Sequence, residues 1–509
     1  SELYSVEDAV SLLSLEALYH SPSEELLGNI AYTLRSIDSG DFEDFIRDVS
    51  HTDAILRKIN KTYELSDDRT RSMYRRKIAE IAKKENISQA KAAEQYGRQI
   101  DLAEGASGGR KALFFLLCLA VPVLISIIIF FVLVSVGQEN AVHAAHTEEN
   151  FLSKISVDGA WVYIMSALVS LFVCIPVSEA MRQISDRFFS GTSQIKTVPS
   201  LKLKQIPNDA KTIVIITTLL FGEKGDRKIF DALERYSLGN RGKNICFGIL
   251  GDLPDAKEMI TSKDAESIAY AEDRIEALNK HYGGGFCLFI RRRSPTSDGS
   301  FMGWERKRGA VVELSSLISG QPTTFETVIC DDAFLHDIKY IITLDADTRL
   351  PLGGALKLVS CMLHPANRPI IRGGKVVGGH AILQPAVATT ADSAACTPFS
   401  VMCTGAGGTD VYAGAAYDTY QTLFDRGSFC GKGIIDAGVF SQLMKDRFPE
   451  ETVLSHDLLE GEYLRSGIIS SVTFSDSTPK NKVSYNKRLH RWIRGDVQAL
   501  AFAEKPPDA

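Results

Sequence analysis

A run of 25 residues without a charged side chain, from Ala112 to Val136, restricts the possible folds of this 509-residue chain more than any other feature. A helix of that length crosses the roughly 30 Å hydrocarbon core of a bilayer, and helices of soluble proteins seldom run so far without a charge. A second apolar run, from Ala160 to Ser178, starts with Trp161 and Tyr163, residue types that favour the membrane interface. The sequence therefore predicts two transmembrane helices.

Basic residues flank the two runs on their outer sides, whereas the connecting segment Gly137 to Gly159 carries only Lys154. Because basic flanks stay in the cytoplasm, both terminal regions are expected there and the short connection outside. We therefore expect a multi-pass membrane protein whose N-terminus and C-terminal domain are cytoplasmic. The flanking basic residues are Arg110, Lys111, Arg182, Arg187, Lys196, Lys202 and Lys204.

Composition excludes several classes of protein. A formal net charge of -6 argues against a partner nucleic acid, whose phosphates require a basic face. The nine cysteines include no CxxC pair, which indicates reduced thiols and argues against a zinc site. The chain divides into three predicted regions, which are residues 1–109, two membrane helices within 110–180, and a C-terminal domain over 200–509.

The first region is expected to be helical and cytoplasmic, since its apolar residues recur at helical spacing, for example from Val10 to Leu18. Ser66 to Asp68 would cap a basic helix from Arg69 to Lys84. The basic run Arg71 to Lys77 in that helix is either a solvated face or a surface for acidic lipid.

The C-terminal domain reads as an α/β fold because short apolar strands alternate with helical stretches. The strands are predicted at Thr212–Leu220, Ile245–Leu250, Phe286–Ile290 and Tyr340–Leu344. We expect them to pair in parallel. In such sheets ligands bind at the carboxyl ends of the strands, so the residues that follow each run are the candidates for chemistry.

Acidic residues follow two of these strands. Asp345 and Asp347 form a DxD triplet after the fourth, where both carboxylates can reach one Mg²⁺ or Mn²⁺ ion that also holds a diphosphate. A DxD triplet also arises by chance, so its position at the end of a buried strand is what favours the metal site. Asp252 follows the second strand and is a candidate acceptor of hydrogen bonds from the base or ribose of a nucleotide donor.

Two later segments carry further candidates. Asp457 opens an apolar helical pattern, where it is either a general base for an attacking hydroxyl or a helix N-terminal acid, and the adjacent His456 is structural or a ligand. In the loop before residue 434, the glycines around Gly431 and Lys432 would let backbone approach a bound ligand.

The segment Arg488 to Asp496 brings guanidinium groups and the indole of Trp492 together. Arginine can clamp a diphosphate, and tryptophan offers a flat face to a sugar. An amphipathic helix lying on the bilayer explains the same residues, and the two interpretations are compatible.

In this order and beside membrane spans, these elements are typical of processive inverting glycosyltransferases of the GT-A fold. More closely, the chain resembles the N-terminal half of the bacterial cyclic β-1,2-glucan synthases, over roughly residues 40 to 500. The phrases that carry the resemblance are Met302–Gly309, Ile341–Pro351, Ile382–Pro385, Gly427–Ile434, Leu454–Asp457 and His490–Asp496.

The resemblance implies a GT-A type α/β domain with two transmembrane helices and an N-terminal helical region, in the bacterial inner membrane. It implies a UDP-glucose donor, a growing glucan as acceptor, and a divalent cation. Carried over to this sequence, the resemblance makes Asp457 the base, and it makes Asp345 and Asp347 the ligands of Mg²⁺ or Mn²⁺. The donor would be contacted by Asp252, Asp345, Lys307, Arg308 and Arg491. The acceptor would be contacted by Trp492, Gly431 and Lys432.

The sequence also departs from the family pattern. Arg488 stands where the QxxRW form has glutamine, and the chain ends at Ala509, whereas the family continues with more spans and a phosphorylase-like module. That module is therefore an expected partner. The alternatives are a processive synthase of the cellulose or hyaluronan type, which linkage analysis of the product separates, and a non-catalytic UDP-sugar-binding scaffold, which would bind UDP without turnover.

Overall fold

A computed structural model describes residues 46, 49–100, 102, 108–146, 159–192, 197–403, 419–453 and 456–502. It divides the chain into two compact units, one made of Ser1–Glu64 with Asp68–Ile100 and the other of Leu65–Asp67 with Asp101–Ala509. The helix expected near Val10 to Leu18 and most of the link between the two apolar runs lie outside the described residues.

In its described part, the secondary structure of the first unit consists of helices joined by short loops. It contains α4 (His51–Ile59), most of α5 (Lys61–Leu65), α6 (Asp68–Glu85) and α7 (Gln89–Tyr96). The predicted basic helix is α6, which starts at Asp68. Serine caps open α4 and α7, where the Ser50 and Ser88 hydroxyls accept hydrogen bonds from backbone N–H groups.

A buried carboxylate, Asp53, organises this unit. Its side chain accepts hydrogen bonds from the Tyr63 hydroxyl, from Arg57 Nε at 2.5 Å and from Arg75 Nη1 at 3.1 Å. Burial would raise the pKa of Asp53, but these partners outweigh it and hold the pKa below the usual value. Part of the basic run on α6 therefore neutralises an internal charge, a role that neither sequence interpretation anticipated.

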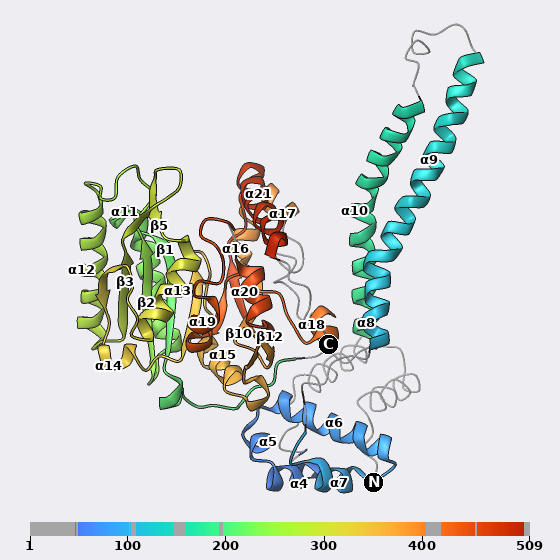
Figure 1. Ribbon diagram of the computed structural model, residues 1–509. Coiled ribbons are helices and arrows are strands. Elements are labelled where there is room, and N and C mark those ends of the chain that lie inside the picture. The colour runs from blue at the N-terminus through green and yellow to red at the C-terminus, as the bar shows by residue number, and fades with distance from the viewer. Residues whose placement is uncertain are drawn as a thin grey trace, which may run out of the picture. The chain divides into compact units, whose positions relative to one another are not determined.

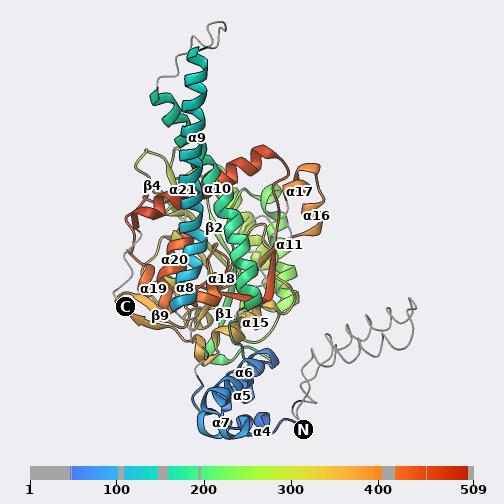
Figure 2. The same cartoon turned by 90° about the vertical axis from the view of Figure 1, so that its right-hand side faces the viewer.

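The two apolar runs form a helical hairpin at the start of the second unit (Figures 1 and 2). α8 (Gly108–Phe115) continues through a π-helical turn, Leu116–Ala120, into α9 (Val121–His146), and α10 (Gly159–Thr192) packs beside α9. Pro122 has no N–H to donate to the preceding turn, which explains a π turn just before it.

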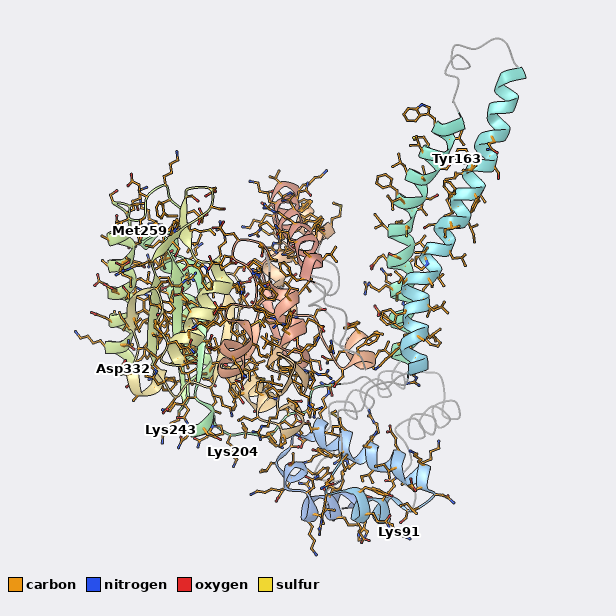
Figure 3. The ribbon with its side chains drawn as sticks, viewed as in Figure 1. Lys91, Tyr163, Lys204, Lys243, Met259 and Asp332 are labelled. Carbon is orange, nitrogen blue, oxygen red and sulfur yellow. The ribbon has the colours of Figure 1, made fainter. Side chains whose placement is uncertain are left out.

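Both hairpin helices are long and apolar enough to cross a membrane. The qualifying segments are Gly108–Gln138 and Trp161–Phe189, and an 18-residue window within each has a mean hydropathy of 3.2 and 2.0, respectively. Large apolar side chains such as Phe131, Leu171 and Phe172 are exposed along them, and Figure 3 shows Tyr163 projecting from α10. Apolar surface of this extent is costly in water and matches a lipid environment.

An eight-stranded sheet forms the centre of the C-terminal domain. Its order is β12-β10-β11-β7-β1-β2-β3-β6. The four predicted strands are β1, β2, β3 and β7, and they pair in parallel as expected. The whole sheet is nevertheless mixed, because β6 and β11 run against their neighbours. The strands are β1 (Thr212–Leu219), β2 (Ile245–Asp252), β3 (Phe286–Arg291), β6 (Phe325–Ile329), β7 (Tyr340–Asp345), β10 (Ile382–Thr389), β11 (Gly433–Asp436) and β12 (Gly467–Asp476).

Helices cover both faces of this sheet, so its central strands are apolar on both sides. In β1, Val214 and Ile216 pack into one core with α11, α12 and α15, while Ile213 and Ile215 pack into the other with α13 and α19. The helices are α11 (Glu223–Asn240), α12 (Asp264–Tyr282), α13 (Arg306–Ile318), α14 (Asp332–Leu335), α15 (Gly354–Met362), α16 (Ala391–Ala394), α17 (Pro398–Cys403), α18 (Thr419–Phe424), α19 (Ala437–Met444), α20 (Asp457–Tyr463) and α21 (Lys482–Ala499).

Smaller elements lie between these. The hairpin pairs are β4 (Arg293–Pro295) with β5 (Phe301–Gly303) and β8 (Ile370–Arg372) with β9 (Lys375–Gly378), and short 3-10 turns occupy Asn208–Ala210, Pro365–Asn367 and Leu500–Phe502. No disulfide joins any of the nine cysteines, all of which lie among the described residues. Figure 3 labels Lys243, just before β2, and Met259, beyond its carboxyl end, at opposite edges of the sheet.

Replacing Asp53 by asparagine should destabilise the first unit by roughly 3 kcal/mol, because Arg57 and Arg75 lose their buried counter-charge. Hydrogen exchange measured by mass spectrometry on the full chain should then speed up about a hundredfold in peptides of α4 to α7 and stay unchanged in the sheet. Glu80→Gln is the matched control, because it removes an exposed acid of the same unit. Equal exchange in both variants would contradict the assigned role of Asp53.

Candidate functional site

The carboxyl edge of the sheet collects charged residues from four strands. Asp252 ends β2, Asp345 ends β7 and Asp476 ends β12. β11 runs against β7, so Lys432, one residue before it, lies at the same edge. The topology therefore brings together groups that are far apart in the sequence.

Two lysines hold the Asp345 carboxylate between them. Lys307, from the first turn of α13, donates hydrogen bonds from Nζ to Asp345 Oδ1 and, at 2.7 Å, to the Gly431 carbonyl. Lys432 Nζ lies 3.3 Å from Asp345 Oδ2 and also pairs with Asp476. Burial would raise the pKa of Asp345, but Lys307 and Lys432 outweigh it and lower the pKa, so this carboxylate stays ionised.

Asp457 lies beside Lys307, at the first residue of α20. A Cβ atom at Gly431 would be 2.9 Å from Asp457 Oδ1 and 3.1 Å from Lys307 Nζ, so both groups face the same glycine. Burial alone would lower the pKa of Lys307, but the carboxylates of Asp345 and Asp457 have the larger, opposite effect. The pKa is therefore raised, and the ammonium stays charged. Asp457, Lys307, Asp345, Lys432 and Asp476 thus form a series of alternating charge, which we call the charge ladder.

Asp347 lies outside the charge ladder, and its side chain is 43% exposed, with Arg488 Nη2 3.8 Å from Oδ2. Burial, and then the nearby carboxylates of Asp476 and Asp345, raise the pKa of Asp347 despite Lys432 and Arg488. Carboxylates that repel one another at a partly open position suit a divalent cation. Among the described residues no group of three or more His, Cys, Asp or Glu side chains forms a metal site unaided, so a cation there would also need oxygen atoms of a substrate.

Asp252 is engaged by a buried arginine. Arg291 Nε and Nη2 donate to its two carboxylate oxygens at 2.8 and 2.7 Å, and Arg291 Nη1 donates to the Trp304 carbonyl at 2.9 Å. Arg291 also lies 3.7 Å from Glu313 on α13. In the structure, therefore, Asp252 fixes the start of the α13 segment that carries Lys307, and its predicted contact with a nucleotide stays a prediction.

The side chain of Arg308 does not reach the site, although that of the preceding residue, Lys307, does. The buried guanidinium of Arg308 lies 3.6 Å from Glu305, donates to the Met444 carbonyl at 3.4 Å and stacks over Phe448. His456 lies in the same cluster, 3.3 Å from Glu305. Burial and Arg308 lower the pKa of His456 to about 3, so it is neutral and serves packing. These contacts give Arg308 a supporting place beneath the site.

The residues at the RW element are mostly exposed on α21. Arg491 is exposed and Trp492 is 37% exposed. Arg488 connects this helix to the site, since it approaches Asp347 and its guanidinium lies 6.0 Å from the centre of the Trp492 ring. The position at which the sequence departs from the QxxRW form is thus the one that reaches the DxD triplet.

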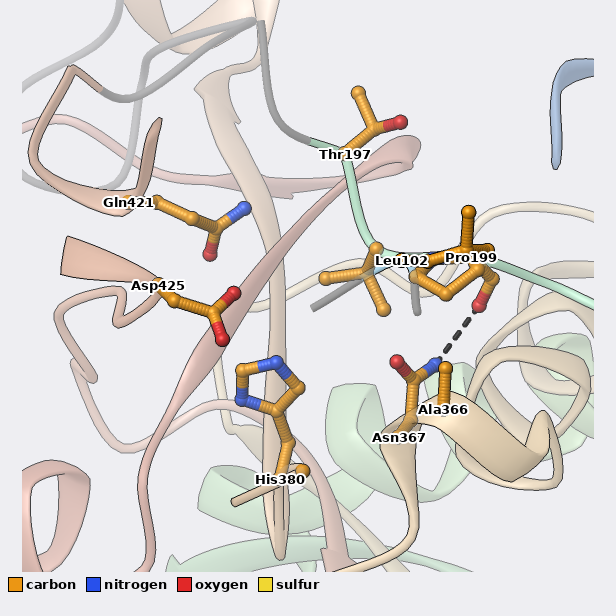
Figure 4. Close-up of a pocket in the computed structure, with 10 residues that line it drawn as sticks. Leu102, Thr197, Pro199, Ala366, Asn367, His380, Gln421 and Asp425 are labelled. Atoms are coloured by element: carbon orange, nitrogen blue, oxygen red, sulfur yellow. Dashed lines mark hydrogen bonds between the residues drawn. The ribbon is translucent and has the colours of Figure 1, made fainter. Parts of the chain in front are cut away.

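Sequence reasoning missed Asp476 and Thr348. Asp476 Oδ1 accepts a hydrogen bond from the Thr348 hydroxyl at 2.7 Å, and Oδ2 pairs with Lys432. A signal was present, since the apolar residues from Gly467 to Phe474 indicate a strand, and Asp476 closes it. None of the predicted site residues lines the small cavity drawn in Figure 4, where Asn367 donates to the Pro199 carbonyl at 2.8 Å near His380 and Asp425.

Comparison with known proteins finds a relative of this chain. The chain is 30% identical, over 531 aligned positions, to the cyclic beta-(1,2)-glucan synthase NdvB of Rhizobium meliloti (strain 1021). The alignment includes 96% of this chain and 18% of that relative, so the chain spans less than a fifth of the relative's length. No family model matches the chain.

Glu460, one helical turn after Asp457, should make stability depend on pH. It is buried, and burial with the Asp457 charge raises its pKa from 4.5 to about 8. The unfolded chain releases this proton near pH 4.5 while the folded chain keeps it to about pH 8, so the contribution of Glu460 to stability is present below pH 4.5 and lost as the pH rises to 8.

Glu460→Gln should therefore narrow the difference in melting temperature between pH 5.5 and pH 8.5 by about 2 °C or more, measured by thermal unfolding in detergent. Glu462→Gln, on the same helix but exposed, is the control. Parallel pH profiles for the unmodified chain and Glu460→Gln would show that Glu460 is ionised throughout.

Proposed function

The chain belongs to the cyclic beta-(1,2)-glucan synthase family, as the counterpart of one segment of a much longer relative, and from that premise we propose that it is a membrane-bound glucosyltransferase. Its domain would be of the GT-A type. It would take glucose from UDP-glucose, with inversion at C1, and add it to a growing β-1,2-glucan. The observation that carries the proposal is the charge ladder, because it assembles a candidate base and a candidate phosphate site at one sheet edge.

Asp457 is the base in this proposal. Its carboxylate would accept the proton of the acceptor hydroxyl as that oxygen attacks C1 and the bond from C1 to the diphosphate oxygen breaks. The ammonium of Lys307 lies beside Asp457, within reach of the same glycine. The Lys307 ammonium and the Asp457 carboxylate carry opposite charges and attract one another.

Asp345 and Asp347 are the proposed ligands of Mg²⁺ or Mn²⁺, and such an ion would offset the negative charge of the departing UDP. We propose that Lys307 and Lys432 bind the same diphosphate, since both ammonium groups already meet at Asp345. For Lys432 this role replaces the acceptor contact that the resemblance implied. Arg491 and Trp492 would bind the leaving UDP and the acceptor glucan from α21, and Gly431 would let the acceptor approach.

The two apolar helices and their basic flanks support a location in the membrane. Two helices long and apolar enough to cross it precede the domain, and basic residues flank them on their outer sides. We therefore place the protein in a bacterial inner membrane, with the N-terminus and the sheet domain in the cytoplasm, where nucleotide sugars are made.

Membranes carrying the chain should transfer label from UDP-glucose in the presence of Mg²⁺ or Mn²⁺, and the products should contain β-1,2 linkages. Asp457→Asn should lower the rate about a hundredfold or more, because the base is lost, while UDP binding is kept. Product linkages other than β-1,2 would favour a synthase of the cellulose or hyaluronan type. Binding of UDP without any transfer by the unmodified chain would favour the scaffold.

Gly431→Ala should lower transfer about tenfold or more. Gly431 has φ +79°, and the added methyl would lie 2.9 Å from Asp457 Oδ1, so the base must move. Gly320→Ala is the matched control, with a similar φ of +70° and no atom near its added methyl. Equal losses of transfer in the two variants would show that backbone strain, and not the displaced base, is responsible.

A further inference from the structure

Asp476 is a largely buried carboxylate at the carboxyl edge of the sheet, and neither the resemblance nor the relative gives it a role. It is the last residue of β12, an edge strand, and its side chain is 17% exposed. We propose that Asp476 is a positioning residue of the transfer site, which holds Lys432 for the diphosphate of the donor and fixes the turn that carries Asp347. This inference rests on the proposed function and deepens it.

The contacts of Asp476 join two segments of the site. Oδ2 pairs with Lys432 Nζ, and Oδ1 accepts the hydrogen bond from Thr348, one residue after Asp347. Backbone bonds reinforce the second link, because Arg349 N donates to the Ser475 carbonyl at 2.8 Å. One carboxylate thus fixes both a cationic side chain and the turn after β7.

Lys432 depends on such an anchor. It stands between Gly431 at φ +79° and Gly433 at φ +148°, which are backbone conformations that only glycine adopts freely. Its long side chain is 12% exposed and ends between Asp476 and Asp345. An ammonium group binds phosphate as a point charge, so its place is set by what holds it and not by its own geometry.

The Asp476 carboxylate also leaves Asp345 able to bind a ligand. With Asp345 alone, Lys432 would pair fully with the DxD triplet and compete with a bound ligand there. Because Asp476 shares the ammonium, Lys432 keeps a partner when Asp345 turns to a ligand. The arrangement therefore keeps the lysine charged and close to the diphosphate position without closing the site.

Asp476→Asn tests this role with little disturbance of the fold. The asparagine amide oxygen can still accept from Thr348, and the strand pairing of Asp476 with Thr389 is between backbones. The change removes the charge that holds Lys432. Asp337→Asn is the matched control, because Asp337 pairs with Lys211 at 2.8 Å away from the carboxyl edge, beside the start of β1.

In the detergent-solubilised chain of 509 residues, Asp476→Asn should weaken UDP binding about tenfold, as measured by calorimetry. It should raise KM for UDP-glucose by a similar factor, with a smaller change in kcat. Asp476→Glu should recover most of the binding. In a Lys432→Gln background, Asp476→Asn should add less than about twofold, because the residue acts through the lysine.

Two outcomes would overturn the inference while leaving the proposed function intact. One is UDP binding by Asp476→Asn equal to that of the unmodified, active chain. The other is an undiminished tenfold loss in the Lys432→Gln background, which would make Asp476 a group that acts without the lysine. Absence of both UDP binding and transfer in the unmodified chain would instead remove the proposed function, and this inference with it.

Discussion

The pairing of Asp345 with two lysines is the interaction on which the site depends. A carboxylate at the end of a buried strand is unfavourable unless cations neutralise it, and Lys307 and Lys432 supply them from different segments of the chain. Each lysine then requires a further acid, Asp457 or Asp476. The alternation lowers the pKa of Asp345 and raises the pKa values of Lys307 and Lys432, so these three groups stay charged in a partly buried place.

Support for this arrangement comes from beneath the sheet edge. Arg291 joins Asp252 to the start of α13 through two hydrogen bonds to the carboxylate and one to the Trp304 carbonyl. The helix turn that carries Lys307 is therefore held in place. Arg308 and His456 pack on Glu305 from the other side of the same helix start. Residues that look catalytic in a motif can thus be the ones that hold the motif in place.

Strand direction decides which residues meet. β11 runs antiparallel to β7, and this reversal turns the glycine-rich loop with Lys432 toward the carboxyl edge, where the parallel strands present their acids. With β11 parallel, Lys432 would lie at the opposite edge and Asp345 would lose a partner. The mixed sheet, which the strand pattern did not predict, is therefore a requirement of the site.

The sequence by itself determined the two apolar helices, the four central strands and the acids at the ends of β2 and β7, because hydrophobic length and alternation are local properties. It also placed Asp457 at a helix start. Tertiary structure alone decided that Arg308 is buried and Lys307 reaches the site, that Arg488 approaches Asp347, and that Asp476 joins Lys432. Partners such as these are separated by tens of residues, and only the strand order and direction bring them together.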